Sequence, residues 1–133
     1  MTVLFPFLPE AEVITPIRSR LAVLFAAFRA FETRFRRSGQ FPGVLYLAPD
    51  PSAPTRALTE AMRQAFPVRP PYGGAVDGMV PHLTLSQGRE LPSSELPNLR
   101  LSTRAQAVSH LALREGRWYE FARYPFAAPG ARR

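Results

Sequence analysis

The residues best suited to chemistry lie in the run Pro81-His82-Leu83-Thr84-Leu85. Alternate side chains of a β-strand share a face, so a strand here would place His82 beside Thr84. Leu83 and Leu85 would then pack on the other face. An imidazole can accept or donate a proton near neutral pH, and the hydroxyl beside it can hold a phosphate oxygen. By spacing alone, a strand histidine with a structural hydrogen bond is the better-supported interpretation of His82, because His-x-Thr occurs often by chance.

The segments around this motif change that interpretation. An apolar run, Phe41–Pro49, precedes a predicted helix, and Pro70–Gly74 and Val80–Leu85 follow it. The order of these segments and the residues within them resemble the bacterial 2′-5′ RNA ligase-like branch of the two-histidine (2H) phosphoesterases. The resemblance is closest over residues 1–87 and weaker from Leu99, where only a strand-turn-strand ending matches. Gly88–Asn98 is short and contains proline, so a helix usual in the family is reduced or lost here.

The resemblance implies an α+β fold with a mainly antiparallel sheet, two main helices and two lobes related by a pseudo-twofold axis. Each lobe carries one His-x-Thr/Ser motif facing a shared cleft. His82 and Thr84 match the second motif, and Thr2 matches the threonine of the first. The first histidine would directly precede Met1, so it and the family's preceding strand are expected to be missing. A misassigned start or a truncation is preferred to a natural loss.

The implied activity is on 2′,3′-cyclic phosphates or 2′-5′ linkages, with no metal or other cofactor. One histidine activates water or the attacking hydroxyl, and the other protonates the leaving oxygen. Thr2 and Thr84 would stabilise charge on the phosphate oxygens. The expected partner is RNA or a nucleotide with a cyclic phosphate. Because one of the two catalytic histidines is expected to be absent, the enzymatic activity of this chain is expected to be impaired. A non-catalytic RNA- or nucleotide-phosphate-binding module, and an unrelated α+β interaction protein, are the alternatives.

Other candidate residues have two interpretations each. Tyr72 lines the cleft or stacks on a base, or it packs within a turn. Arg69 and Arg89 flank the motif strand in sequence, where they reach the phosphate or are solvated surface charges. His110 is interpreted as a sheet-face histidine, and core packing is the default for Trp118 and Tyr119.

Two helices and several strands are predicted to position these residues. Thr15 and Pro16 begin a helix whose apolar face includes Leu21 and Phe25. Phe31–Arg37 alternates as a strand, although it could extend that helix with Gly39 as its C-cap, and the strand is preferred. The other predicted elements are a strand at Thr2–Phe7, a hairpin through Ser38–Gly43 to Val44–Leu47, a helix at Pro54–Phe66, a loop at Pro67–Pro81, and strands at His82–Ser86, Leu99–Arg104, Ala107–Leu113 and Arg117–Tyr124, with Glu115–Gly116 as the last turn.

Composition indicates one domain, here assigned to residues 1–126 with a flexible tail at 127–133. The chain has 133 residues, 46% of them hydrophobic, no cysteine and a net charge of +7 carried entirely by arginine. Arginine binds phosphate through two parallel hydrogen bonds, so this surplus favours phosphate-bearing partners. There is no apolar run long enough to span a membrane and no secretory signal, which predicts a cytoplasmic protein. Without the family's first strand, an open sheet edge would invite a homodimer.

Overall fold

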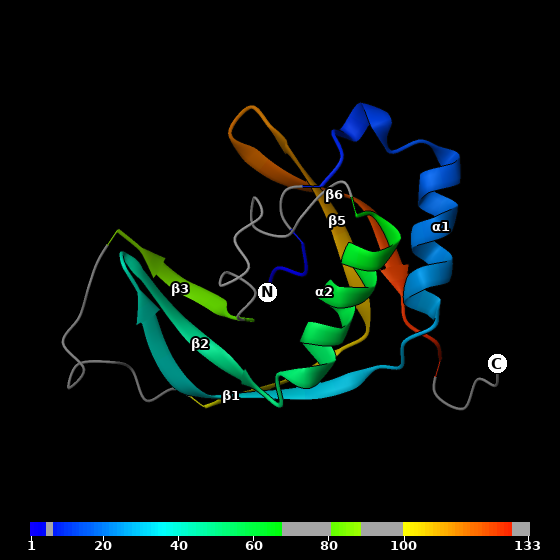
Figure 1. The fold of residues 1–133 in the computed structure, drawn as a ribbon. Coiled ribbons are helices and arrows are strands. Elements are labelled where there is room, and N and C mark those ends of the chain that lie inside the picture. Colours follow the sequence, from blue (N-terminus) through cyan, green and yellow to red (C-terminus); the bar gives the residue numbers. More distant parts are fainter. Residues whose placement is uncertain (5–6, 68–80, 89–99, 129–133) are drawn as a thin grey trace. The chain divides into compact units, whose positions relative to one another are not determined.

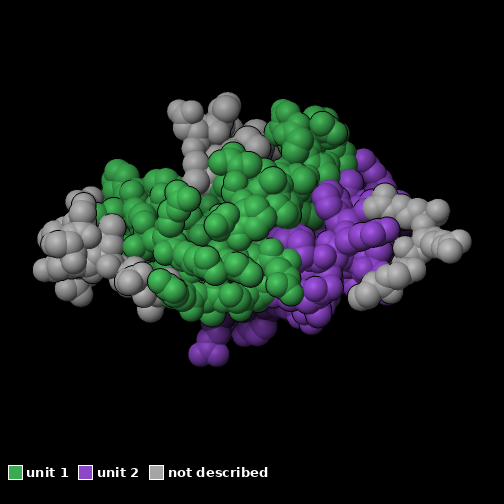
Figure 2. All heavy atoms as spheres, turned by 90° about the horizontal axis from the view of Figure 1, so that it is seen from below, with its two compact units in different colours: residues 1–7, 32–103 green, residues 8–31, 104–133 purple. Residues whose placement is uncertain are grey.

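The computed structural model describes residues 1–4, 7–67, 81–88 and 100–128. The chain forms two compact units (Figure 2). Unit 1 contains residues 1–7 and 32–103, and unit 2 contains residues 8–31 and 104–133. The fold is α+β, with two helices and mostly antiparallel strands, as the sequence predicts.

Unit 1 is built on a four-stranded sheet of order β3-β2-β1-β4 (Figure 1). Its elements are β1 (Phe31–Phe41), β2 (Val44–Asp50), helix α2 (Ala53–Ala65), β3 (Leu83–Gln87) and β4 (Leu101–Ala105). Both β1 and β3 pair with β2 in antiparallel register.

The β1–β2 hairpin confirms the strand interpretation of Phe31–Arg37. Its turn is shorter than predicted, because β1 continues to Phe41, which pairs directly with Val44. Only Pro42 and Gly43 remain in the turn, and Gly43 has a φ of 71°. A left-handed residue suits glycine, which pays no Cβ penalty there.

Helix α2 buries one face in the core of unit 1, as the predicted helix at Pro54–Phe66 requires. Thr55, Leu58, Thr59 and Met62 recur at helical spacing and are all buried. Phe66 follows the helix, and its ring meets that of Phe7 edge-on at 5.1 Å. The strands contribute buried side chains to this unit from alternating positions: Thr33 and Phe35 on β1, and Leu45 and Leu47 on β2.

Unit 2 pairs a helix with a hairpin. Its elements are the 3₁₀ turn η1 (Glu10–Glu12), helix α1 (Thr15–Ala26), β5 (Ala107–Arg114) and β6 (Arg117–Pro125). Leu21 and Phe25 of α1 are buried, and the Phe25 ring lies 6.0 Å from that of Tyr124. The predicted helix is confirmed, with Ile14 rather than Thr15 as its N-cap.

Two local expectations are wrong. Residues 1–4 contain no strand, so the predicted strand at Thr2–Phe7 does not form over the described part of that segment. Trp118 and Tyr119 are 55% and 46% exposed rather than packed in a core. They lie near the tip of a two-stranded sheet, where each strand has only one neighbour to cover it. The flexible tail expected at 127–133 stays a prediction, because residues 129–133 lie outside the described part. At its start, the Ala127 backbone N–H donates a hydrogen bond of 2.8 Å to the Phe28 carbonyl.

The β5–β6 turn supports a stability prediction. Glu115 and Gly116 have φ angles of 50° and 76°, which is the two-residue turn that matches strand twist. A Cβ at Gly116 would meet nothing within 4 Å, so the cost of Gly116→Ala is backbone strain alone. We expect the free energy of unfolding, measured in urea, to fall by about 1–2 kcal/mol. Glu115→Asn should raise the free energy of unfolding slightly, since asparagine tolerates this conformation. A Gly116→Ala protein as stable as the parent would contradict the prediction.

Candidate active site

The His-x-Thr pair lies at the start of β3. His82 directly precedes the strand, which begins at Leu83, one residue later than predicted. Thr84 pairs with Tyr46 of β2, whereas Leu83 pairs with the buried Leu47. Residues paired across a ladder share a face, so Thr84 and Tyr46 lie on the face opposite to Leu47. Thr84 is exposed to solvent.

Aromatic rings hold the imidazole of His82 on that same face. The His82 ring lies 5.2 Å from the Phe41 ring at 87°, and 5.6 Å from the Tyr46 ring at 64°. Phe41 and Tyr46 stack on each other at 4.5 Å and 25°. We call these three residues the His82 cluster. Edge-to-face contacts of this kind favour a fixed relative orientation of the rings. His82 and Thr84 therefore share a face, as their spacing predicts.

A glycine makes this arrangement possible. Gly39 of β1 pairs with Tyr46. A Cβ built on Gly39 would lie 2.7 Å from the Tyr46 hydroxyl oxygen and 2.8 Å from its Cζ. The Tyr46 ring thus lies directly across the Gly39 backbone. The interpretation of Gly39 as a helix C-cap is wrong, and the residue instead leaves space for the ring that contacts His82.

The predicted alternation fails at Leu85. Tyr46 pairs with Thr84 and Leu45 with Ser86, so Leu85 has no direct partner and is the extra residue of a bulge. The side chain is 40% exposed instead of packed with Leu83. The position of this bulge depends on how β3 pairs with β2, so the sequence of β3 alone does not predict the exposure of Leu85.

Thr2 is not on a strand beside β3. The strand that pairs with β3 is β2, and β3 lies at one end of the four-stranded sheet. The N-terminal segment is instead attached to α2, because the buried Thr59 hydroxyl donates a hydrogen bond of 2.7 Å to the Val3 carbonyl. The predicted strand at Thr2–Phe7 therefore does not place Thr2 beside the His-x-Thr strand. The role of Thr2 in phosphate binding stays a prediction.

The substrate-binding candidates Arg69, Tyr72 and Arg89 lie outside the described residues. Sequence reasoning did not single out Phe41 and Tyr46 as site residues. The two-residue turn at Pro42–Gly43 could have predicted the pairing of Tyr46 with Gly39, but it could not have predicted that β3 would bring His82 against them.

His110 lies in unit 2, on β5, as predicted for a sheet-face histidine. Its ring is half-buried and lies 4.4 Å from the Phe121 ring. Burial lowers the pKa of His110 below its ordinary value, Arg18 lowers it further, and Glu10 opposes both. This favours a neutral imidazole at pH 7. Glu10 itself is ion-paired with Arg114, which lowers the pKa of Glu10.

The sequence as a whole decides the family. Residues 1–116 match the family described as the 2′-5′ RNA ligase superfamily. The chain belongs to the 2′-5′ RNA ligase superfamily. Comparison with curated proteins gives no match. The match covers all of unit 1, including the His82 cluster, and unit 2 as far as residue 116. It supports the phosphoesterase- or ligase-like character that the resemblance implies.

Two further observations concern ligands and membranes. Within the described ranges, no group of three or more histidine or acidic side chains is arranged to hold a metal ion. Over the same part of the chain, no helix is long and apolar enough to cross a membrane.

Proposed function

We propose that this member of the 2′-5′ RNA ligase superfamily acts on RNA ends or nucleotides that carry a 2′,3′-cyclic phosphate, by acid–base catalysis without a metal ion. The His82 cluster carries the proposal. In this cluster two aromatic rings hold an imidazole, and the exposed hydroxyl of Thr84 lies beside it on the same face of the sheet. Family membership adds the substrate class.

In this proposal His82 serves one side of the phosphorus. It either removes the proton from the attacking water or donates a proton to the leaving 2′ or 3′ oxygen, since an imidazole can serve as general base or general acid. The Thr84 hydroxyl donates a hydrogen bond to a non-bridging oxygen, where charge increases in the transition state. The contacts of Phe41 and Tyr46 fix the ring before substrate arrives, which lowers the entropy cost of reaching the reactive geometry.

The other side of the phosphorus needs a second proton-transfer group. The family resemblance implies that this group is the histidine of the first motif, whose threonine Thr2 matches. We therefore expect the 133-residue chain to hydrolyse a 2′,3′-cyclic mononucleotide about 10²–10⁴-fold more slowly than a chain extended upstream through that histidine. The rates would be measured by chromatography of the monophosphate product, with any purification tag at the C-terminus.

The matched control carries the same upstream extension with alanine in place of the histidine. It should be as slow as the 133-residue chain, because it restores the added strand but not the proton-transfer group. Adding a chelator should leave every rate unchanged. Equal rates for the three chains would contradict the proposal. If all three bind nucleotide phosphate but none hydrolyses it, the alternative of a non-catalytic RNA- or nucleotide-phosphate-binding module is correct.

A further inference from the structure

A basic pocket opens on unit 1 where β1 and β2 meet the start of α2. It has a volume of about 210 Å³ and is lined by Arg36, Arg37, Ala48, Pro49, Asp50 and Ser52. Because one water takes about 30 Å³ of liquid volume, this is room for a phosphate group with part of its hydration shell. We call it the Arg36–Arg37 pocket.

A bulge in β1 is what brings two successive arginines to one pocket. Phe35 pairs with Pro49 and Arg37 with Ala48, so Arg36 is an extra residue without a direct partner. Successive residues of a regular strand point to opposite faces, whereas a bulge re-aims one of them. Both arginines are exposed, so their guanidinium groups are reached from solvent.

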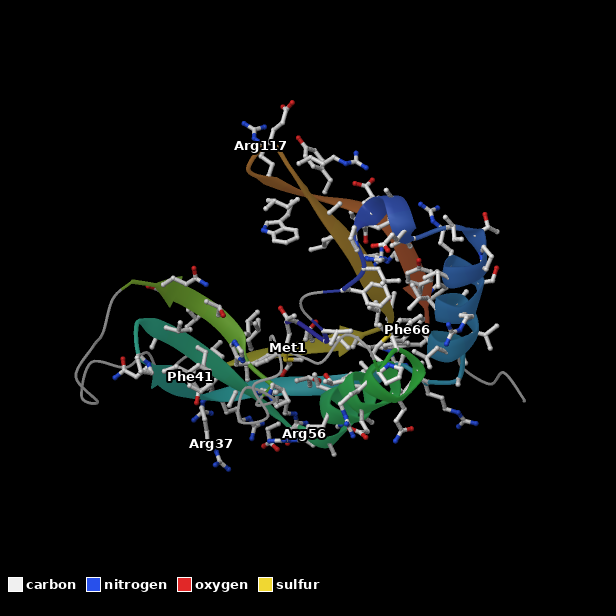
Figure 3. The ribbon with its side chains drawn as sticks, turned by 45° about the horizontal axis from the view of Figure 1, so that its top comes forward. Met1, Arg37, Phe41, Arg56, Phe66 and Arg117 are labelled. Atoms are coloured by element: carbon white, nitrogen blue, oxygen red, sulfur yellow. The ribbon has the colours of Figure 1, made fainter. Side chains whose placement is uncertain are left out.

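The charge of the pocket favours an anion. Two guanidinium groups outnumber the one carboxylate, that of Asp50. A third arginine, Arg56 of α2, donates to the Ser52 hydroxyl at 3.5 Å and so stands at the rim. Arg37 and Arg56 project to the same side of the ribbon in Figure 3. Guanidinium groups match the paired oxygens of a phosphate, which makes a phosphate the best-fitting occupant.

The pocket and the His82 cluster lie on the same face of the sheet. Arg37, Gly39 and Phe41 are alternate residues of β1, and they pair with Ala48, Tyr46 and Val44. The pocket residue Ala48 is thus only two residues along β2 from Tyr46, or about 7 Å. Aromatic rings next to a line of cations form the usual surface for a single-stranded nucleic acid, whose bases stack while its phosphates follow the charges.

We propose that the Arg36–Arg37 pocket binds a backbone phosphate of a single-stranded RNA whose terminal phosphate lies at His82. The inference rests on the proposed function and adds that oligonucleotides bind more tightly than single nucleotides, because they supply a second phosphate for this pocket.

The test measures binding of a fluorescein-labelled, eight-nucleotide single-stranded RNA with a 3′-phosphate, by anisotropy at several salt concentrations. The variant is Arg36→Gln with Arg37→Gln. We expect its affinity to be roughly tenfold lower, since an exposed ion pair contributes up to about fivefold. The slope of log affinity against log salt should fall by about 0.7, because the pocket neutralises one phosphate and each phosphate contact on a single strand contributes about 0.7. Hydrolysis of a cyclic mononucleotide should not change.

The matched control is Arg63→Gln with Arg117→Gln, which removes the same charge. Arg63 is paired with Glu60 on α2, and Arg117 begins β6 in unit 2; neither residue lines the pocket (both α2 and Arg117 can be followed in Figure 3). A further variant, Asp50→Asn, should raise RNA affinity about two- to fivefold. Misfolding cannot produce that gain.

Three results would overturn the inference. They are equal losses in the two double variants, an unchanged salt slope in the pocket variant, or displacement of the RNA by an acidic peptide as effectively as by unlabelled RNA. These results concern binding of an RNA that is not cleaved. Failure of the proposed function would appear separately, as an absence of cyclic-mononucleotide hydrolysis by the upstream-extended chain.

Discussion

Replacing His82 with alanine is expected to lower the hydrolysis rate of a 2′,3′-cyclic nucleotide by about 10²–10⁴-fold in the upstream-extended chain, because one general acid or base contributes that much. In the 133-residue chain the same change should have a much smaller effect. Groups that act as a pair lose most of their benefit when either is absent. The comparison of the two backgrounds therefore reports whether His82 works alone or with a partner.

The chain contains its own control for this experiment. His110 is the only other histidine in the sequence, and it too contacts aromatic rings, although it lies on a strand. It lies in unit 2, near Arg18, with its pKa lowered by burial. His110→Ala should leave the rate unchanged. A comparable loss from both substitutions would mean that His82→Ala acts through stability, or that His110 is the missing proton-transfer group. Thermal melting of both variants distinguishes these two explanations.

Local sequence patterns predict the elements of this fold well, and pairing between distant segments accounts for the errors. Helix α2 (Ala53–Ala65) forms where the spacing of Leu58 and Met62 predicts it, and the predicted last residue, Phe66, directly follows it. Strand β1 follows from the alternation of Phe31, Thr33 and Phe35, of which the last two are buried. These signals act between neighbours in sequence, so they hold before any tertiary contact is known.

The errors have a different origin. Leu85 is exposed because β2 skips it in the ladder. Thr2 is outside any strand because Val3 is bound by Thr59, which is 56 residues away in the sequence. The His82 cluster likewise joins the β1–β2 hairpin to a strand about forty residues later, across a segment outside the described residues. The motif could be found from sequence, but the rings that orient it could not.

Gly39 offers the clearest way to test whether those rings matter for chemistry. Alanine at this position would place its Cβ 2.7 Å from the Tyr46 hydroxyl oxygen, so the ring must withdraw. The Tyr46 ring contacts both Phe41 and His82, and its movement displaces the imidazole. A misplacement of about 1 Å can reduce a rate roughly 10²-fold. We therefore expect Gly39→Ala to lower kcat by up to about 10²-fold in the extended chain, with little change in KM.

Gly39→Ala should have almost no further effect on kcat when Tyr46 is already alanine. Tyr46→Ala alone removes the ring from His82 and should itself lower kcat, but it also leaves the space above Gly39 empty. The double variant should then be no slower than Tyr46→Ala, because the alanine Cβ has no ring to displace. Residues in direct contact give such non-additive effects, whereas independent sites give additive ones. Hydrogen-exchange protection of β1 and β2 would be followed in all four proteins to separate a moved ring from a weakened sheet. If the losses from the two single variants simply add, Gly39 acts on the backbone of β1, and the ring of Tyr46 does not orient His82.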